Sequence, residues 1–294
     1  MKRDFLRLSD FSPADHAALF RRARELKEAR RQGEVVATLA GRSLLLLFEK
    51  HSTRTRLSFE AAIGQLGGTA ITLPMQDSQI SRGESLADTG AVASRYVDAI
   101  MYRTFGDDRL RDLARAATVP VINGLSDGGH PVQLLADLFT IEERLGSLAG
   151  KVVAWVGDGT SNMALSWMEA ASVFGFTLRI SAPEGFRPPN RLGIRADPRE
   201  AVRDADVVTT DVWVSMGQEK EAAARRQAFA GYCVDEELLA LAKPSAIVLH
   251  CLPAHRGEEI SAGVIDGPQS AVLDEAENRL HVQKALLEAL ILRR

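Results

Sequence analysis

A short run of hydroxyl and guanidinium side chains, Ser52 to Arg56, carries the strongest chemical signal in the sequence. It follows the apolar run Ser43 to Phe48, which is typical of a buried strand. It precedes the amphipathic stretch Leu57 to Leu66, which is typical of a helix. The run therefore falls at a strand-to-helix turn, where free backbone N–H groups and the positive end of the helix dipole favour an anion. A guanidinium can bind two oxygens of a phosphate while Ser and Thr hydroxyls bind the others.

The two arginines of this run, Arg54 and Arg56, oppose the helix dipole and so need a negative partner. Residues two apart on a helix point in different directions. We therefore expect one arginine to bind the anion and the other to pair with a protein carboxylate. Simple helix capping is the alternative interpretation, since Ser and Thr are common at helix starts.

Bulk composition limits the class of protein. The 294 residues suit two domains of ordinary size, and 46% apolar with 26% charged residues is typical of globular proteins. A net charge of -3 gives no general signature of nucleic-acid binding. Two cysteines, Cys233 and Cys251, are too few for a disulfide framework and fit a reducing compartment. Because the sequence has no signal-peptide pattern and no membrane-spanning run, we expect a cytoplasmic protein without a membrane partner.

Strand-like and helical segments alternate along the chain. The expected strands cover residues 43–48, 69–73, 99–102, 120–122, 152–156, 177–180, 207–210, 247–250 and 271–273. This rhythm predicts an α/β fold of two domains, each a mostly parallel sheet flanked by helices, joined by bridging helices. We place the first domain at residues 1–135 and the second at 150–274. The long helix Pro131 to Leu145 should bridge them, and the terminal helix, residues 275–294, should pack back onto the first domain.

Two further candidate positions, Arg103 and His130, lie in the first domain. Arg103 follows an expected strand, and ligands of open α/β sheets bind at the carboxyl ends of strands. His130 precedes Pro131, which suits the first position of a helix, so we expect His130 at the N-cap with Gln133 facing the same ligand. A cationic imidazole is disfavoured near a helix N-terminus, so a neutral hydrogen-bond donor is expected. An ordinary surface arginine and a capping histidine are the alternatives.

In the second domain, Asp211 and Ser215 follow another expected strand. Asp211 could bind an ammonium group, while Ser215 and the N–H of Met216 could hold polar groups of a small substrate. The charged and alanine-rich stretch 218–226 has no evident core face, which is typical of a mobile lid. A solvated helix after a turn is the alternative interpretation of that stretch.

Cys251 follows His250, which raises the question of a metal site. Neighbouring residues on a strand point to opposite faces, so we expect no shared metal ion. A polar contact in a substrate pocket is the favoured role of Cys251, with a buried structural thiol as the alternative. The glycine-rich turn Gly157 to Gly159 is a weak nucleotide signal, because Asn162 occupies the third glycine position of the dinucleotide pattern. We therefore expect the amide of Asn162 to bind substrate.

Together these motifs resemble the aspartate and ornithine carbamoyltransferases over essentially the whole chain. The segment Phe48 to Arg56 is similar to the family's carbamoyl-phosphate motif, and His130 to Gln133 resembles its second shared motif. Asp211 to Gly217 and His250 to Pro253 resemble blocks of the ornithine branch, as does the terminal Glu277 to His281. One departure is Ser161, where many ornithine enzymes carry a second asparagine.

The resemblance implies carbamoyl transfer from carbamoyl phosphate to the δ-amine of L-ornithine, in arginine biosynthesis, by a homotrimer or an assembly of trimers without metal or organic cofactor. It implies that the catalytic residues are Arg103, His130, Asp211 and Cys251. It assigns carbamoyl phosphate to Ser52, Thr53, Arg54, Thr55, Gln79, Arg103, His130 and Gln133, with Gln79 reaching a neighbouring subunit's site. It assigns ornithine to Asn162, Asp211, Ser215, Met216, Cys251 and Leu252, and makes Arg279 a further active-site contact.

Three alternatives stay open beside this interpretation. Two are carbamoyltransferases that use aspartate or an N-acylornithine as the acceptor. The first would need extra basic groups for a second carboxylate, and the second would need room where Asp211 takes a free ammonium group. The third is a non-catalytic relative that binds a phosphate metabolite or a partner protein. A nicotinamide dehydrogenase is disfavoured by the broken glycine pattern.

Overall fold

The computed structural model describes residues 2–188, 193–215 and 217–292. The chain forms two compact units: unit 1 comprises Met1–Leu135 and Glu277–Arg294, and unit 2 comprises Ala136–Ala276. Each unit is built on one parallel sheet flanked by helices, so the predicted α/β class is confirmed. Two helices, α5 (Pro131–Leu145) and α11 (Val272–Ile291), contribute residues to both units.

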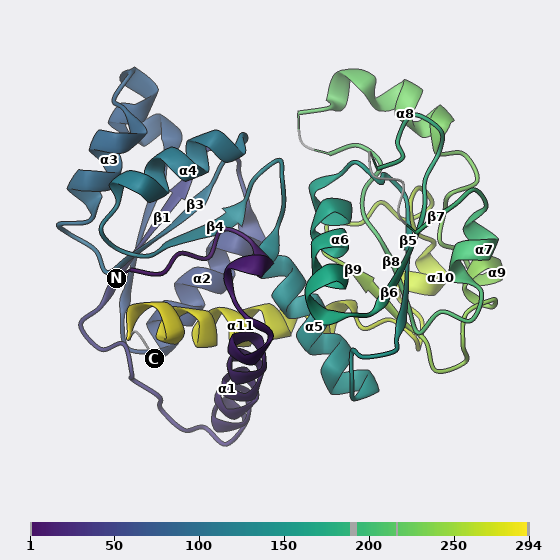
Figure 1. Ribbon diagram of the computed structural model, residues 1–294, viewed down its shortest axis with the longest axis horizontal. Coiled ribbons are helices and arrows are strands. Elements are labelled where there is room, and N and C mark those ends of the chain that lie inside the picture. The colour runs from purple at the N-terminus through teal and green to yellow at the C-terminus, as the bar shows by residue number, and fades with distance from the viewer. Residues whose placement is uncertain (1, 189–192, 216, 293–294) are drawn as a thin grey trace. The chain divides into compact units, whose positions relative to one another are not determined.

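Unit 1 contains a parallel sheet in the order β2-β1-β3-β4. Its strands are β1 (Ser43–Phe48), β2 (Thr69–Pro74), β3 (Ala99–Arg103) and β4 (Val121–Leu125). Its other elements are η1 (Leu8–Asp10), α1 (Pro13–Arg31), α2 (Thr53–Gln65), η2 (Met75–Asp77), η3 (Gln79–Arg82), α3 (Leu86–Ala93) and α4 (Asp107–Ala116). Figure 1 shows α3 and α4 side by side over one face of this sheet. On that face Leu45, Ile100 and Tyr102 of the strands form one buried cluster with Leu110 and Leu113 of α4.

Polar contacts between α1 and α11 hold α11 in unit 1. The Nε of Arg22 donates to Oε2 of Glu288 over 2.6 Å, and the Nζ of Lys27 donates to Oδ1 of Asn278 over 2.6 Å. Both acceptors lie on α11, and Lys27 and Asn278 are buried. This anchoring fixes the position of Arg279, the next residue of α11, which reaches the candidate site described below.

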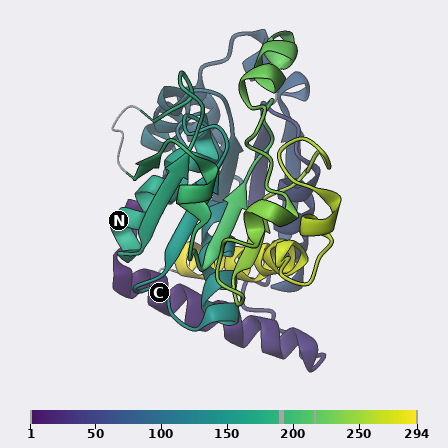
Figure 2. The same cartoon turned by 90° about the vertical axis from the view of Figure 1, so that its right-hand side faces the viewer.

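Unit 2 contains a parallel sheet in the order β7-β6-β5-β8-β9, with its strands side by side in Figure 2. The strands are β5 (Val152–Val156), β6 (Thr177–Ser181), β7 (Ile194–Arg195), β8 (Val207–Thr210) and β9 (Ile247–His250). The helices are α6 (Asn162–Phe174), α7 (Pro198–Val202), η4 (Glu219–Glu221), α8 (Ala222–Ala228), α9 (Glu236–Leu239) and α10 (Ala262–Ile265). Ala154, Val208 and Val248 bring the three neighbouring strands β5, β8 and β9 into one buried cluster.

Three details differ from the predicted elements. Residues 271–273 are not a strand, because α11 begins at Val272, while Ser270 forms an isolated bridge with Val248. The short strand β7 was not predicted. Helix α2 begins at Thr53, earlier than predicted, because the Oγ of Ser52 caps it.

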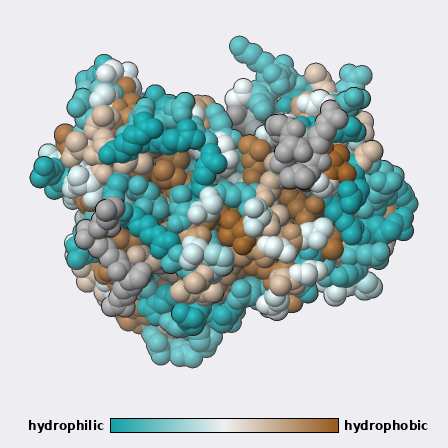
Figure 3. All heavy atoms as spheres, in the orientation of Figure 1, coloured by the Kyte–Doolittle hydropathy of each residue, from teal (hydrophilic) through white to brown (hydrophobic). Residues whose placement is uncertain are grey.

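Hydrophilic residues cover much of the face shown in Figure 3, with hydrophobic residues between them. None of the described helices combines the length and the apolar character needed to cross a membrane. Several large apolar side chains of unit 1 are nevertheless exposed: Leu57, Ile71, Val92, Tyr96 and Phe105.

Candidate active site

The turn between β1 and α2 presents the N-terminus of α2 in unit 1. The Oγ of Ser52 accepts a hydrogen bond from the N–H of Thr55 over 3.2 Å, so the capping interpretation holds for this hydroxyl. Thr53, the first residue of the helix, is exposed. Arg56 donates to Glu60 over 2.8 Å, so it is the arginine that pairs with a carboxylate. Arg54 instead lies close enough to His130 to lower the pKa of that imidazole.

Thr55 is the point where side chains from three elements meet. Its Oγ1 accepts hydrogen bonds from Nη1 of Arg103, at the end of β3, over 3.4 Å, and from Nη2 of Arg279 on α11. The Nη1 of Arg279 also donates to Oε1 of Gln133, in the first turn of α5, over 3.0 Å. All four side chains are buried. The structure therefore brings together four of the residues predicted to bind carbamoyl phosphate or to contact the active site.

His130 lies beside this group, one residue before α5. Its carbonyl accepts the N–H groups of Gln133 and Leu134, which is the N-cap position that the sequence predicted. Burial lowers the pKa of His130 well below its ordinary value, and the positive charges of Arg279, Arg103 and Arg54 lower it further. The imidazole is therefore neutral near physiological pH, and it can serve as a hydrogen-bond donor or acceptor without a net charge.

Glu49, which was not predicted as a site residue, holds the end of β1 against β3. Its N–H donates to the carbonyl of Arg103 over 2.9 Å. Its carboxylate accepts hydrogen bonds from Tyr102, Thr104 and Arg109. Burial acts to raise the pKa of Glu49, but these donors outweigh burial and hold the pKa below its ordinary value. A carboxylate three positions before Ser52, at the end of an apolar run, was the sequence signal for this positioning role.

Gln79 lies apart from these residues. It is exposed at the start of η3, and no hydrogen bond within the described ranges joins its side chain to the group around Thr55. Its expected contribution to a neighbouring subunit's site stays a prediction. The remaining residues of unit 1 combine guanidinium groups, a helix N-terminus and a neutral imidazole. Such a set can bind a phosphate dianion and can donate hydrogen bonds to an adjoining carbonyl oxygen.

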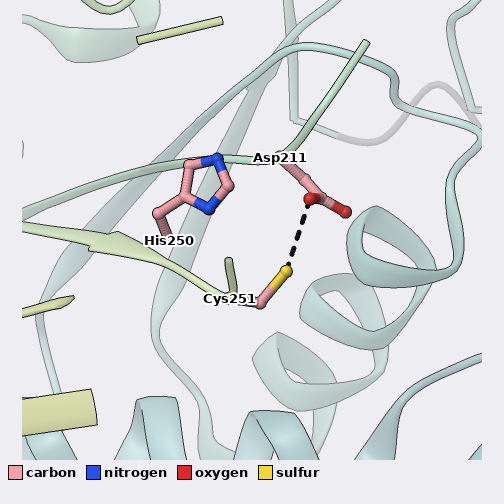
Figure 4. Close-up of side chains that lie close together, drawn as sticks. All are labelled: Asp211, His250 and Cys251. Carbon is pink, nitrogen blue, oxygen red and sulfur yellow. Dashed lines mark hydrogen bonds between the residues drawn. The ribbon is translucent and has the colours of Figure 1, made fainter. Parts of the chain in front are cut away.

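In unit 2, Asp211, His250 and Cys251 converge just beyond β8 and at the end of β9 (Figure 4). The Sγ of Cys251 donates to Oδ1 of Asp211 over 3.3 Å, and the same oxygen accepts the N–H of Val212 over 2.8 Å. Burial raises the pKa of Asp211. Burial, followed by the charge of Asp211, raises the pKa of Cys251 well above its ordinary value. Cys251 is therefore a protonated thiol suited to a polar contact, and it is poorly suited to act as a nucleophile.

The expectation that His250 and Cys251 point to opposite faces is wrong. One donor atom from each of Asp211, His250 and Cys251 lies within 4.8 Å of the others. The reason is that β9 ends at His250, so the alternation of a strand does not extend to Cys251. Both ring nitrogens of His250 are already engaged: Nδ1 accepts the N–H of Leu252 over 2.9 Å, and Nε2 donates to Oε1 of Glu259 over 3.1 Å. A metal ion in this cluster would have to displace one of those hydrogen bonds.

The other residues predicted to bind ornithine lie on the same edge of the unit 2 sheet. Asn162 begins α6 after β5, and the Oγ of Ser161 caps that helix by accepting the N–H of Ala164. The N–H of Ser215 donates to Oε1 of Gln218 over 3.0 Å in the turn after β8. Leu252 follows β9 with a φ of 58°, a strained conformation for this residue type. Met216 lies outside the described residues.

Arg225 was not predicted, although it joins two segments of this half-site. Its Nε donates to the carbonyl of Trp213 over 2.5 Å, and its Nη2 donates to Asp158. The guanidinium also lies 4.7 Å from the ring centroid of Phe186. The expectation that the stretch 218–226 has no core face is therefore wrong. Arg225 supplies the buried contact with only 4% of its area exposed. Hydropathy scores arginine as a surface residue, so the sequence pattern did not reveal it.

Family models match both parts of the chain. Residues 3–143 match the carbamoyl-P binding domain of aspartate/ornithine carbamoyltransferase, and residues 149–290 match the Asp/Orn binding domain of the same family. The chain belongs to the aspartate/ornithine carbamoyltransferase family. The resemblance found in the sequence motifs is therefore confirmed.

Relatives of this carbamoyltransferase match it over nearly its whole length. The ornithine carbamoyltransferase of Geobacter metallireducens is 52% identical over 303 residues, which cover 99% of this chain and 100% of that protein. That of Halorhodospira halophila is 54% identical over 298 residues, covering 99% of each chain. The crystal structure of ornithine carbamoyltransferase from Burkholderia thailandensis has a TM-score of 0.91 and 48% identity, covering 99% of each chain. The ornithine carbamoyltransferase from Pyrococcus furiosus has a TM-score of 0.93 and 47% identity, covering 98% of this chain and 96% of that one.

Proposed function

We propose that this enzyme transfers the carbamoyl group of carbamoyl phosphate to the δ-amine of L-ornithine, giving L-citrulline and phosphate. The names of its relatives and the family models of both parts of the chain support this activity. The structural observation that carries the proposal is the convergence of Arg103 and Arg279 on the Oγ1 of Thr55, beside the neutral His130. Such a set suits a ligand that joins a dianion to a carbonyl group.

Carbamoyl phosphate binds in unit 1 in this proposal. The N-terminus of α2, with Ser52, Thr53 and Arg54, takes the phosphate oxygens, because backbone N–H groups and the helix dipole favour an anion there. Arg103 lies at the end of β3 and bridges the phosphate and the carbonyl oxygen. Thr55, His130 and Gln133 hold the carbamoyl group, with Gln133 positioned by the hydrogen bond from Arg279. Gln79 completes the phosphate site of a neighbouring subunit.

Ornithine binds in unit 2 in this proposal. Asp211 takes the α-ammonium group, while Asn162, Ser215 and Met216 hold the α-carboxylate and α-amino groups. The Asp211–Cys251 pair also orients the δ-amine, because the S–H of Cys251 holds the Asp211 carboxylate while the second carboxylate oxygen and the sulfur keep acceptor capacity for the amine. The backbone of Leu252, held by its hydrogen bond to His250, offers a further contact.

The chemistry needs no metal or organic cofactor, because the two substrates supply every atom and electron pair. The neutral δ-amine attacks the carbamoyl carbon, and a C–N bond forms. Negative charge develops on the carbonyl oxygen, where Thr55, Arg103 and His130 donate hydrogen bonds. The C–O bond to phosphate then breaks, and the departing phosphate accepts the proton of the amine. The protein accelerates this reaction by orienting each of the two substrates and by stabilising the oxyanion, without a covalent intermediate.

Parallel assays with three acceptors test the assignment. Purified enzyme is given carbamoyl phosphate with L-ornithine, L-aspartate or N-acetyl-L-ornithine, and each carbamoylated product is measured separately. Turnover with ornithine alone is the expected result. Turnover with another acceptor would keep the phosphate site but overturn the roles given to Asp211 and Ser215. Folded protein without turnover on any acceptor would favour a relative that only binds a phosphate metabolite.

We further propose that the enzyme works in the cytoplasm in arginine biosynthesis, as a homotrimer or an assembly of trimers, without a nucleic-acid or membrane partner. A 40% identical relative is the anabolic ornithine carbamoyltransferase of Campylobacter jejuni, which supports the biosynthetic direction. The exposed apolar side chains Leu57, Ile71, Val92 and Tyr96 of unit 1 suit contacts between subunits. Light scattering of the purified protein tests the trimer, and a monomer at assay concentration would contradict it.

A further inference from the structure

A second group of potential metal ligands lies in unit 2, in the segment that follows Pro253. One donor atom each from His255, Glu258 and Glu259 lies within 4.8 Å of the other two. The side chain of Glu259 is fully buried, that of Glu258 is 27% exposed and that of His255 is 49% exposed. The group is therefore anchored at one end in the protein interior and open to solvent at the other.

Each of the two carboxylates uses one oxygen for structure and leaves the other without a partner. The Oε1 of Glu259 accepts the Nε2–H of His250 and the N–H of His255, and the Oε1 of Glu258 accepts the Nε–H of Arg226 over 3.0 Å. Both Oε2 atoms are buried, and neither has a hydrogen-bond partner among the described residues. A buried carboxylate oxygen without a donor is costly, so these two atoms favour a bound cation.

The ring of His255 is available as the third ligand. Its Nδ1 lies 3.9 Å from the Oε2 of Glu259, which is too far for a hydrogen bond. No hydrogen bond within the described ranges engages either ring nitrogen. The cluster of Asp211, His250 and Cys251 differs in this respect, because both ring nitrogens of His250 are occupied and the Cys251 thiol already donates to Asp211.

The charges around this group also suit a cation. The pKa of Cys233 is raised to about 11, first by burial and then by the charges of Asp235, Glu259 and Glu236, so two further carboxylates act on the same side chain as Glu259 does. Arg226 balances the charge of Glu258 through Oε1 of that carboxylate. The Oε2 of Glu258 keeps no hydrogen-bond partner among the described residues.

We propose that His255, Glu258 and Glu259 bind one divalent first-row metal ion, such as Mn²⁺ or Zn²⁺. One imidazole and two carboxylates form a mixed N/O ligand set, which Mn²⁺ and Zn²⁺ accept more readily than Mg²⁺ or Ca²⁺ do. With metal–ligand bonds of about 2.1 Å, ligand atoms of a tetrahedral site lie roughly 3.4 Å apart. The donor atoms now lie within 4.8 Å of one another, so the side chains of His255 and Glu258, which are partly exposed, would move closer to Glu259 on binding the ion. Three protein ligands leave coordination positions for water.

This ion goes beyond the proposed reaction, in which it takes no part. It binds behind the ornithine half-site, because Glu259 bridges the ion and His250, and His250 in turn holds the N–H of Leu252. Glu258 connects the ion to α8 through Arg226. The ion would therefore hold the segment 253–260 against α8 and reduce the local motion of both.

The test is a titration of the full-length, chelator-treated protein with MnCl₂. Binding is measured by calorimetry and by the loss of the EPR signal of free Mn²⁺. We expect one ion per chain in the unmodified protein. His255→Ala and Glu258→Gln should each weaken binding by at least about tenfold. The matched control is Glu237→Gln, which removes an exposed carboxylate on α9 of the same unit and should leave the affinity unchanged. His255 and Glu258 are accessible enough for these variants to fold, which circular dichroism verifies.

A second titration with ZnCl₂ separates the two possible clusters. Cys251→Ser removes the thiol of the other cluster, and we expect it to keep the affinity of the unmodified protein, whereas His255→Ala should weaken binding. The proposal is overturned if neither ion binds at about 1 mM, which would leave less than about 4 kcal/mol of binding free energy. It is equally overturned if His255→Ala keeps full affinity, or if binding is lost in Cys251→Ser.

Discussion

The buried ion pair between Arg225 and Asp158 gives a quantitative prediction for unit 2. The two side chains are 5% and 4% exposed, so water screens their interaction very little. Arg225→Met keeps most of the apolar stem but leaves the carboxylate of Asp158 without its cation. It also removes the donor to the carbonyl of Trp213. Breaking one partner of a buried pair costs about 3–5 kcal/mol, against about 0–1 kcal/mol for an exposed pair. We therefore expect Arg225→Met to lower the free energy of unfolding by about 3–5 kcal/mol.

Arg226→Met is the matched control, because Arg226 is the neighbouring residue and also pairs with a carboxylate. The side chain of Arg226 is 53% exposed and that of its partner Glu258 is 27% exposed. It should change the free energy of unfolding by no more than about 1 kcal/mol in metal-free buffer. Asp158→Asn combined with Arg225→Met removes both buried charges, so the double variant should be more stable than Arg225→Met alone.

Tryptophan fluorescence during urea unfolding measures these changes in unit 2 alone, because all three tryptophans of the chain, Trp155, Trp167 and Trp213, belong to that unit. A loss below about 1 kcal/mol in Arg225→Met would refute the reasoning, since it would give the buried pair the energy of a surface pair. A double variant less stable than the single variant would refute it as well. On the proposed function, Arg225→Met should also raise the KM for ornithine more than the KM for carbamoyl phosphate, because the segments it joins lie in unit 2.

Three further predictions concern the site residues. Arg103→Ala should lower turnover by about 10²–10³-fold, because it removes a donor to the developing oxyanion, and near-normal steady-state rates would contradict the proposed site. Native protein should react with iodoacetamide at least about tenfold more slowly than free cysteine near pH 8. The reason is that burial and nearby carboxylates raise the pKa values of Cys233 and Cys251, and mass spectrometry of the labelled chain checks both thiols. The third concerns His130, whose lowered pKa keeps it neutral in the folded state while the unfolded residue takes up a proton below its ordinary value of 6.5. As pH falls below that value, His130 therefore lowers the free energy of unfolding by about 1.4 kcal/mol per pH unit, until pH reaches its folded pKa. His130→Asn should remove this slope in urea unfolding followed by circular dichroism, and parallel pH profiles of the two proteins would contradict it.

The strands were predictable because buried parallel strands are short apolar runs with polar ends. The predicted run Ser43 to Phe48 is β1, residue for residue, and the run at 152–156 is β5. The apolar residues 271–273 were mistaken for a strand, because three apolar residues carry no period that separates a strand from the first turn of a helix such as α11.

Local patterns indicated which side chains have useful chemistry, but they did not reveal which of them meet. Thr55 and Arg279 are 224 positions apart, and only the packing of α11 in unit 1 brings the guanidinium to the hydroxyl. Arg225 was missed because a buried, paired arginine has the same hydropathy as an exposed one. The proximity of Cys251 to His250 depended on where β9 ends, and element boundaries are the least certain feature of a sequence pattern.

Unit 1 is discontinuous in sequence, and this has a consequence for the order of events during synthesis. Residues 277–294 supply Asn278 and Glu288, which anchor the chain to α1, and they supply Arg279, which reaches Thr55. Domains fold as they emerge from the ribosome, and the continuous unit 2, Ala136–Ala276, is available before this last helix. The first segment of unit 1 to be translated is therefore completed only after unit 2 has been synthesised, and a nascent chain holds an unfinished anion site until Asn278, Arg279 and Glu288 emerge.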